Sequence, residues 1–138
     1  MEVTKTPALG DERRESSKEN YRPGPFDYQR LDAFRVARES LVRGQELIRR
    51  LPRGQRKLAD QLWRALLGAY LQVAEGASRS GDDRLCRYRG ARAEAAEAAA
   101  AVEAVGLLGL APLPEAEQLT LLLGRLCAML TRLSGVGR

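Results

Sequence analysis

Apolar residues recur at steps of three and four along most of the chain, which is the period of an α-helix buried on one face. In the last such stripe these positions are Leu119, Leu122, Leu126, Met129 and Leu133. An earlier stripe stops before Pro52, which cannot continue a helix. Its apolar positions are Phe34, Ala37, Leu41, Ile48 and Leu51. No segment alternates between apolar and polar residues as a half-buried strand does, so we expect an all-α fold.

Turn residues divide this helical pattern into four segments. Ser80 and Gly81 separate the second segment from the third, and Gly109 ends the third before Pro112 and Pro114. Because the connections are short, we predict an up-down-up-down antiparallel four-helix bundle in a single domain over residues 26–135. The predicted helices cover about residues 27–51, 54–78, 83–108 and 115–134.

The third predicted helix passes through an alanine-rich stretch at residues 91–101. Alanine is the best helix former, and its small side chain lets neighbouring helices approach closely. The stretch is apolar over more than one stripe, which indicates a helix that is central or that carries a subunit interface. No helix is central in a four-helix bundle, so we favour an interface.

The first 25 residues contain five basic and five acidic residues and few large apolar ones. A segment that buries little apolar area cannot offset the entropy lost on ordering. We therefore expect residues 1–25 to form a disordered or loosely attached tail.

The composition of the 138-residue chain argues against an enzyme, because the chain contains no histidine. That absence excludes Ser-His-Asp and Cys-His catalysis and any metal site with imidazole ligands. We expect no cofactor and no bound metal. The two cysteines, Cys86 and Cys127, are too few for a disulfide framework; we expect them to be small core residues in a reducing cytoplasm. No signal peptide or membrane-spanning run is apparent, so no membrane partner is expected.

The net charge of +5 is unevenly distributed along the chain. Residues 26–90 hold 14 Lys and Arg against 8 Asp and Glu, whereas residues 91–138 hold 4 against 5. All but one of those 14 bases are arginine, whose planar guanidinium suits phosphate and carboxylate. The same excess would also arise on an ordinary solvated helix surface of a protein from an arginine-rich proteome.

Seven basic residues gather within 22 positions around Pro52, among which the only acids are Glu46 and Asp60. They straddle the turn between the first two helices, so they should cluster at one end of that hairpin. Few aromatic residues lie among them, which favours contacts to the backbone and shape of folded or double-stranded RNA over base stacking. These candidate nucleic-acid-binding residues are Arg43, Arg49, Arg50, Arg53, Arg56, Lys57 and Arg64.

The second predicted helix carries a motif that the apolar period does not explain. It reads QLWRALLGAYLQVAEGASR and spans residues 61–79. This motif resembles the signature of the four-helix-bundle family of the 23S rRNA intervening-sequence proteins. The matching positions are Gln61, Arg64, Ala65, Ala74, Glu75, Gly76 and Arg79. Trp63 stands where the family has a basic residue, and residues 69–71 replace a Ser-Ile-Pro-like stretch.

The resemblance continues over about residues 27–133. Tyr88, Ala91, Arg92 and Glu97 fall where the family has an aromatic, a small-residue and basic stretch, and a glutamate. The likeness implies an up-down four-helix bundle that assembles as a ring-shaped homopentamer without catalysis. A related branch, the accessory variability protein of diversity-generating retroelements, implies a basic pentamer that binds a reverse transcriptase and its structured template RNA.

Within the motif, Glu75 and Glu97 lie in small-residue stretches of neighbouring helices. Two carboxylates can serve as an acid/base pair, but here no nucleophile, metal-ligand cluster or phosphate loop accompanies them. We expect each to pair instead with Arg64, Arg79 or Arg92 at a helix contact or subunit seam. We expect Gly76 to be a helix-end or close-packing glycine.

Two hypotheses for function remain. In the first, a non-enzymatic homo-oligomer binds structured RNA or other nucleic acid through its arginine-rich surface. In the second, the protein is an interaction scaffold, such as a reverse-transcriptase accessory protein, without direct RNA binding.

Overall fold

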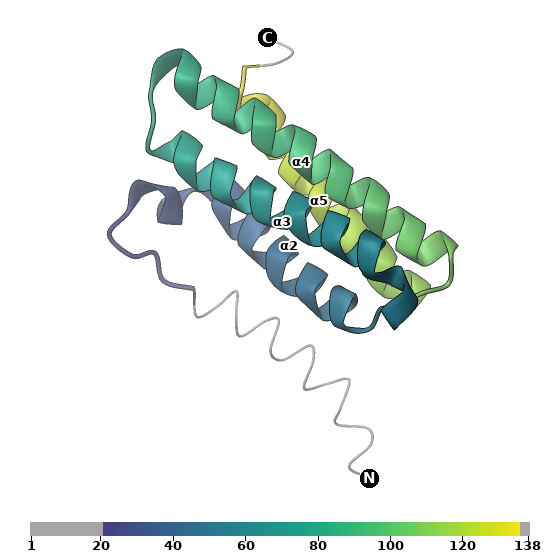
Figure 1. Cartoon of the computed structure of the whole chain (residues 1–138). Helices are drawn as coiled ribbons and strands as arrows, with labels where there is room; N and C mark the ends of the chain where they lie inside the picture. Colours follow the sequence, from purple (N-terminus) through teal and green to yellow (C-terminus); the bar gives the residue numbers. More distant parts are fainter. Residues whose placement is uncertain (1–20, 136–138) are drawn as a thin grey trace.

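The computed structural model describes residues 21–135 and confirms the all-α four-helix bundle (Figure 1). No strand occurs within this range. Each helix packs on the next along the chain, and α2 also packs on α5, which closes the bundle. The elements are η2 (Asp27–Arg30), α2 (Asp32–Arg49), η3 (Arg53–Gln55), α3 (Arg56–Ala77), α4 (Gly81–Leu107) and α5 (Leu113–Leu133).

The helix boundaries differ from the predicted ones by one to five residues. The segment 27–51 is predicted as one helix, but its first residues form the 3-10 turn η2, and the extended residue Leu31 (φ −78°, ψ 128°) separates that turn from α2. At the other end of the chain, α5 starts two residues earlier than predicted and includes Pro114 in its first turn. Proline is tolerated there because the first N–H groups of a helix have no intrahelical acceptor.

The predicted stop at Gly109 is confirmed. Gly109 has φ +68°, a left-handed conformation that glycine adopts without steric cost. Its N–H donates to the carbonyl of Gly106 (3.1 Å), and the N–H of Leu110 donates to the carbonyl of Val105 (3.0 Å). These two bonds satisfy carbonyls that the end of α4 would otherwise leave free. The chain can therefore turn directly into α5.

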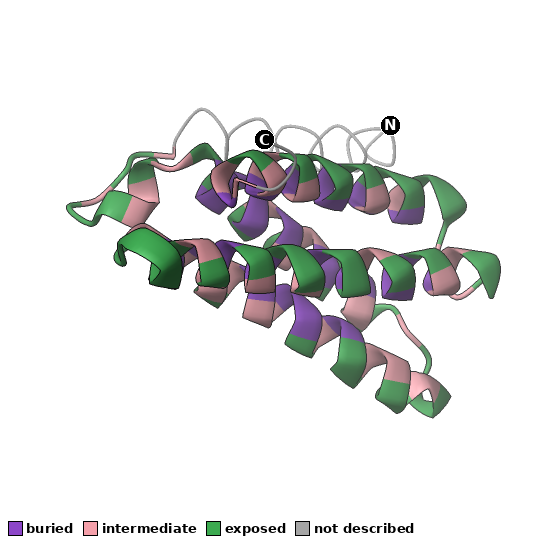
Figure 2. Cartoon of the chain, turned by 90° about the horizontal axis from the view of Figure 1, so that it is seen from above, coloured by how far each residue is buried: buried purple, intermediate pink, exposed green. Residues whose placement is uncertain are grey.

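The buried positions of the four helices face one another in the interior (Figure 2). Most of the residues at these positions are leucine and alanine, as the predicted stripes require. The α5 residues Leu119, Leu123, Leu126 and Leu130 are almost completely buried. Close approach of α2 and α3 depends on Gly44, where an added Cβ would lie 2.1 Å from Cδ1 of Leu66. Since Leu66 is itself buried, the two helices could not keep this distance with a larger residue.

The last part of the predicted tail is attached to the bundle. The hydroxyl of Tyr21 donates to the carbonyl of Gln29 (2.7 Å). The guanidinium groups of Arg35 and Arg38 lie 5.6 Å and 5.3 Å from the centre of the Tyr21 ring, which is cation–π geometry. The prediction of a loose tail therefore does not hold at Tyr21; the first 20 residues, on which most of that prediction falls, lie outside the described residues.

The prediction that both cysteines are core residues is wrong for Cys86, which is exposed. Tyr88 and Ala91 occupy the core-facing positions of this part of α4, so Cys86 falls on the outer side. Cys127 is half-buried, and burial raises the pKa of its thiol. In the described range 21–135, no helix is both long and apolar enough to cross a bilayer.

Candidate nucleic-acid interface

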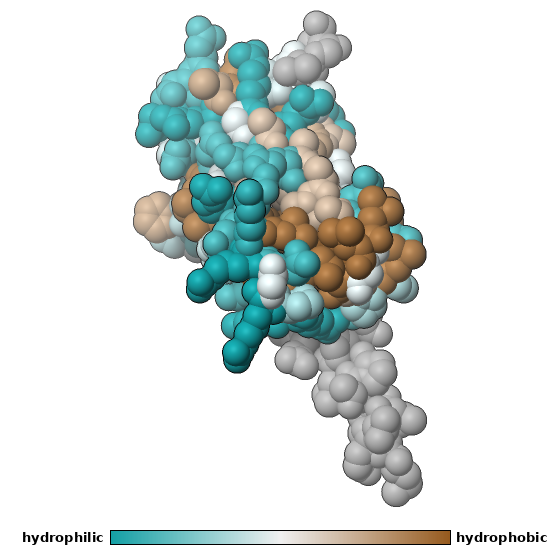
Figure 3. Space-filling model, turned by 45° about the vertical axis from the view of Figure 1, so that its right-hand side comes forward, coloured by the Kyte–Doolittle hydropathy of each residue, from teal (hydrophilic) through white to brown (hydrophobic). Residues whose placement is uncertain are grey.

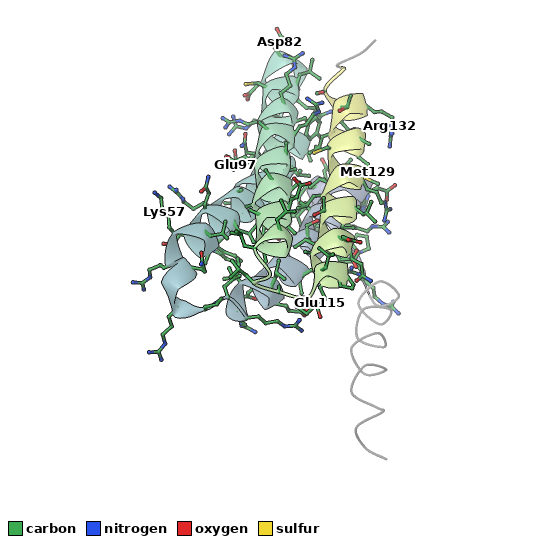
Figure 4. All side chains as sticks on the ribbon, turned by 90° about the vertical axis from the view of Figure 1, so that its right-hand side faces the viewer. Lys57, Asp82, Glu97, Glu115, Met129 and Arg132 are labelled. Carbon is green, nitrogen blue, oxygen red and sulfur yellow. The ribbon has the colours of Figure 1, made fainter. Side chains whose placement is uncertain are left out.

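The basic cluster predicted around Pro52 lies at one end of the α2–α3 hairpin. The extended backbone of Pro52 (φ −61°, ψ 154°) and the short turn η3 reverse the chain there. Lys57 points away from the bundle on the first turn of α3 (Figure 4). Arg64 lies seven residues further along, which is two helical turns and nearly the same face. The structure thus brings most of the predicted site to one end of the molecule.

Two of the seven predicted residues are held in ion pairs. Arg43 donates to Glu39 on the same helix (2.8 Å), and both side chains are largely buried. Arg50 pairs with Glu115 at the start of α5. The hydrogen bond and the charge of Glu115 raise the pKa of Arg50. Arg50 therefore joins the end of α2 to α5, whereas Arg43 pairs within α2, and both are less available to an external anion.

The other five have no acidic partner among residues 21–135. No carboxylate oxygen of the described residues lies within 4 Å of their charged groups, and all five side chains are exposed. Such groups keep their full charge and their hydrogen-bond donors for an external anion. We call these residues, namely Arg49, Arg53, Arg56, Lys57 and Arg64, the free basic cluster.

At the α3–α4 turn, at the opposite end of the bundle, two arginines are paired with acids. Arg79 donates to Asp83 (2.8 Å), which lowers the pKa of that carboxyl group. Arg87 lies between Asp83 (3.7 Å) and Glu75 (3.3 Å). Arg84 donates to the last carbonyls of α3 and so caps that helix. These contacts stabilise the α3–α4 turn and leave Arg79 and Arg87 less available to an external anion.

The predicted partners of the motif glutamates are wrong for Glu75, which pairs with Arg87 and not with Arg64, Arg79 or Arg92. Glu97 is exposed, and no cation of the described residues lies within 4 Å of it. Its predicted ion pair within the bundle is therefore absent from this range.

The prediction for Gly76 is confirmed. Gly76 is buried in the last turn of α3, where an added Cβ would lie 2.6 Å from Cε1 of Tyr88. Ala65 is buried and Ala74 is half-buried against the core, whereas Gln61, Arg64 and Arg79 are exposed. The motif therefore combines packing positions with surface positions on one helix.

Glu94 is an unusual carboxylate that the sequence did not single out. It lies over Gly68, where an added Cβ would be 2.7 Å from Oε2 of Glu94. Burial raises the pKa of Glu94, and the negative charge of Glu97 raises it further, while Arg64 opposes the shift. No cation of residues 21–135 lies within 4 Å of it. The α3–α4 seam thus contains an acid that is easier to protonate than usual.

We expect Glu94→Gln to stabilise the fold at pH 7. The pKa of Glu94 is higher in the folded state than in the unfolded state. Ionisation of Glu94 therefore destabilises the fold when the pH rises above the ordinary pKa of glutamate, and glutamine at this position avoids that cost. The gain should be less than about 1 kcal/mol, because the carboxylate remains partly solvated. Urea unfolding at pH 7 and pH 3.5 measures it; the gain should vanish at the lower pH. The exposed Glu103→Gln on the same helix should be neutral at both, and an equal gain there would contradict the explanation.

Large apolar side chains are exposed beside the basic end. Leu107, Leu108 and Leu113 are 78%, 65% and 53% exposed around the α4–α5 turn. The ion pair between Arg50 and Glu115 joins this turn to the α2–α3 turn at the same end. Figure 3 shows hydrophobic residues gathered next to long hydrophilic side chains. We call these three leucines the leucine patch. A contiguous apolar patch of this kind is typical of an interaction surface.

The outer side of α4 is also smooth and uncharged in part, with Ala93, Ala96 and Ala100 exposed. The helix therefore buries one alanine face and leaves another uncovered, as a helix apolar over more than one stripe must in a bundle of four.

A second feature of the basic end is an open hollow of about 490 Å³ between the end of α2 and the start of α3. Its apolar lining consists of Ile48, Leu51, Pro52 and Ala59. Arg53, Arg56 and Asp60 complete it. The sequence did not indicate this hollow, because the apolar residues come from two helices whose relative placement only the fold defines.

Comparison with known proteins assigns no family. No known family profile matches the chain, and no curated protein is significantly similar to it in sequence.

Proposed function

We propose that this protein is a non-enzymatic cytoplasmic homo-oligomer, most simply a pentamer, that binds structured RNA through the free basic cluster. The observation that carries the proposal is the gathering of five exposed cations around one turn of the bundle. None of the five has an acidic partner among residues 21–135, whereas Arg79 and Arg87 at the α3–α4 turn are paired with acids. Unpaired cations gathered on one surface attract polyanions.

The chemistry of the cluster favours phosphate over a single carboxylate ligand. Four of its five members are arginines, which can hold phosphate oxygens with two parallel hydrogen bonds. No aromatic residue belongs to the cluster, so its contacts are to the backbone of the nucleic acid. A folded RNA holds many phosphates at fixed positions. Such an array suits cations that a rigid bundle also holds at fixed positions.

Assembly would strengthen such binding. The resemblance to the intervening-sequence family supports a ring of five subunits, in which each basic end is repeated around an axis. Five weak sites that engage one RNA together bind far more tightly than one site alone. The uncovered alanines of α4 and the nearly neutral second half of the chain favour self-association there, because like-charged basic ends repel one another.

The test is a titration of a fluorescent RNA hairpin with the full chain at several salt concentrations. If all five cations contact phosphates, the logarithm of the association constant should fall with the logarithm of salt concentration with a slope of roughly −4 per site. A slope near zero, or no binding at low salt, would contradict the proposal. Light scattering on the same sample measures the oligomeric state, and a 15 kDa monomer would contradict the ring.

The leucine patch favours the second candidate function, an interaction scaffold for an acidic protein such as a reverse transcriptase. Exposed leucines add nothing to phosphate binding, but beside cations they suit an acidic partner with an apolar face. A pull-down from nuclease-treated lysate separates the two candidates. A protein partner should survive the nuclease and be lost with Leu107→Glu, whereas partners bridged by RNA should disappear with the nuclease.

A further inference from the structure

The open hollow beside Pro52 combines three kinds of group that together fit one nucleotide. Its apolar lining comes from the end of α2, the turn that follows and the start of α3. Ile48, Leu51 and Ala59 are half-buried, and Pro52 is exposed. Its volume of about 490 Å³ falls within the range of about 300–1,000 Å³ that is common for small-molecule sites. A flat apolar ligand that packs against such a lining is removed from water, and this removal favours binding.

Two cations and one anion flank this lining. Arg53 and Arg56 belong to the free basic cluster and line the hollow. Asp60 lies one helical turn after Arg56 and lines it too. No cation of the described residues lies within 4 Å of the Asp60 carboxylate. The hollow therefore offers donors for phosphate and, beside them, an acceptor-only group with free lone pairs.

The acceptor distinguishes among the four bases. A carboxylate accepts best from two neighbouring N–H donors, as it does from arginine. The Watson–Crick edge of guanine presents such a pair, N1–H and the N2 amino group. Adenine and cytosine present one amino group beside acceptor nitrogens, and uracil presents one N–H between two carbonyl oxygens. Repulsion between these acceptors and the carboxylate weakens the binding of the other three bases.

We propose that this hollow binds an unpaired guanosine of a structured RNA. The face of the base lies against Leu51 and Pro52, its Watson–Crick edge donates to Asp60, and the neighbouring phosphates lie on Arg53 and Arg56. The guanosine must be unpaired, because pairing occupies the same edge; bulges and loops supply such bases. This inference rests on the proposed function and adds one base-specific contact to a surface that otherwise holds the backbone.

Binding of four hairpin RNAs that differ only in one bulged nucleotide tests the proposal. Fluorescence anisotropy with the full chain should show about 10-fold tighter binding of the guanosine bulge than of the adenosine, cytidine or uridine bulges, in line with a bidentate base contact. An inosine bulge, which lacks the N2 amino group, should fall between guanosine and the others. Equal binding of all the bulges with the expected salt dependence would overturn this inference and leave the proposed function intact. No binding of any hairpin at low salt would overturn both.

Asp60→Asn tests the assigned residue. The amide keeps the shape of the side chain but replaces one acceptor oxygen by a donor, so the preference for guanosine should fall to less than about 2-fold. Asp82→Asn, an exposed aspartate at the opposite end of the bundle, makes the same charge change and should keep the preference. A preference unchanged by Asp60→Asn would overturn the assignment.

Free nucleotides separate an RNA site from a mononucleotide site. Guanosine monophosphate should displace the guanosine-bulged hairpin only at concentrations at least 100-fold above the dissociation constant of that RNA, because it lacks the surrounding phosphates. Guanosine monophosphate that binds as tightly as the hairpin would overturn the assignment to RNA.

Discussion

Reversing Arg53, Arg56 and Lys57 to glutamate together is expected to weaken the binding of structured RNA by roughly 100-fold or more at physiological salt. The three side chains are exposed and have no acidic partner in the described part of the chain, so the changes remove phosphate contacts without breaking an ion pair there. Each substitution also places a negative charge where a phosphate would lie. The fold should survive, because none of the three contributes to the core. Titration of an RNA hairpin measures the loss, and circular dichroism checks the helices.

A matched control separates local charge from net charge. Changing Arg92, Arg125 and Arg132 to glutamate alters the net charge by the same amount, but these exposed arginines lie on α4 and α5. Light scattering first checks that this variant keeps its oligomeric state, because Arg92 lies next to the exposed alanines of α4. With the assembly unchanged, the reversal should weaken RNA binding only through the longer-range field, which salt screens within about 8–10 Å. If the two triple variants lose the same affinity, binding follows the total charge and the free basic cluster is not the site.

The fold could be predicted from the sequence because its signals are local. The leucine stripe that ends at Leu133 follows one helix face, and Pro52 and Gly109 stop helices for reasons that hold in any context. The boundaries were less predictable. Proline is excluded from a helix interior but not from the first turn of a helix. Whether Pro114 precedes α5 or lies in its first turn depends on the path of the chain after α4.

The electrostatic partners could not be predicted, because they depend on how the helices are placed relative to one another. Arg50 and Glu115 are 65 residues apart in sequence and meet only because α2 and α5 close the bundle. Glu75 has several arginines within reach along the chain, and the α3–α4 packing selects Arg87. Seven basic residues around one turn therefore looked equivalent, although two of them are engaged within the protein.

Burial of polar groups was also beyond the sequence. Glu94 and Glu97 stand three residues apart in the same alanine-rich helix, yet only Glu94 lies in the seam with α3, where glycine leaves space for it. The position of a residue around a helix that is apolar on nearly all sides cannot be read from its neighbours, since alanine does not mark which face is inside. The wrong expectation for Cys86 has another cause, because it rests on residue type alone, whereas Tyr88 and Ala91 mark the buried face of this part of α4.

Leu123→Ala is expected to destabilise the bundle by about 2–5 kcal/mol, whereas Leu121→Ala should change the stability by no more than about 0.5 kcal/mol. The two leucines are two positions apart on α5, but Leu123 is completely buried and Leu121 is 72% exposed. Removing three buried carbon atoms loses their transfer free energy and leaves a cavity between close-packed helices. Urea unfolding of both variants measures the difference, and similar urea dependence of the two transitions shows that they unfold to the same extent. Equal losses at the two positions would mean that Leu121 is also covered in the assembled protein, so that contacts between subunits, and not the single bundle alone, determine the stability of this face.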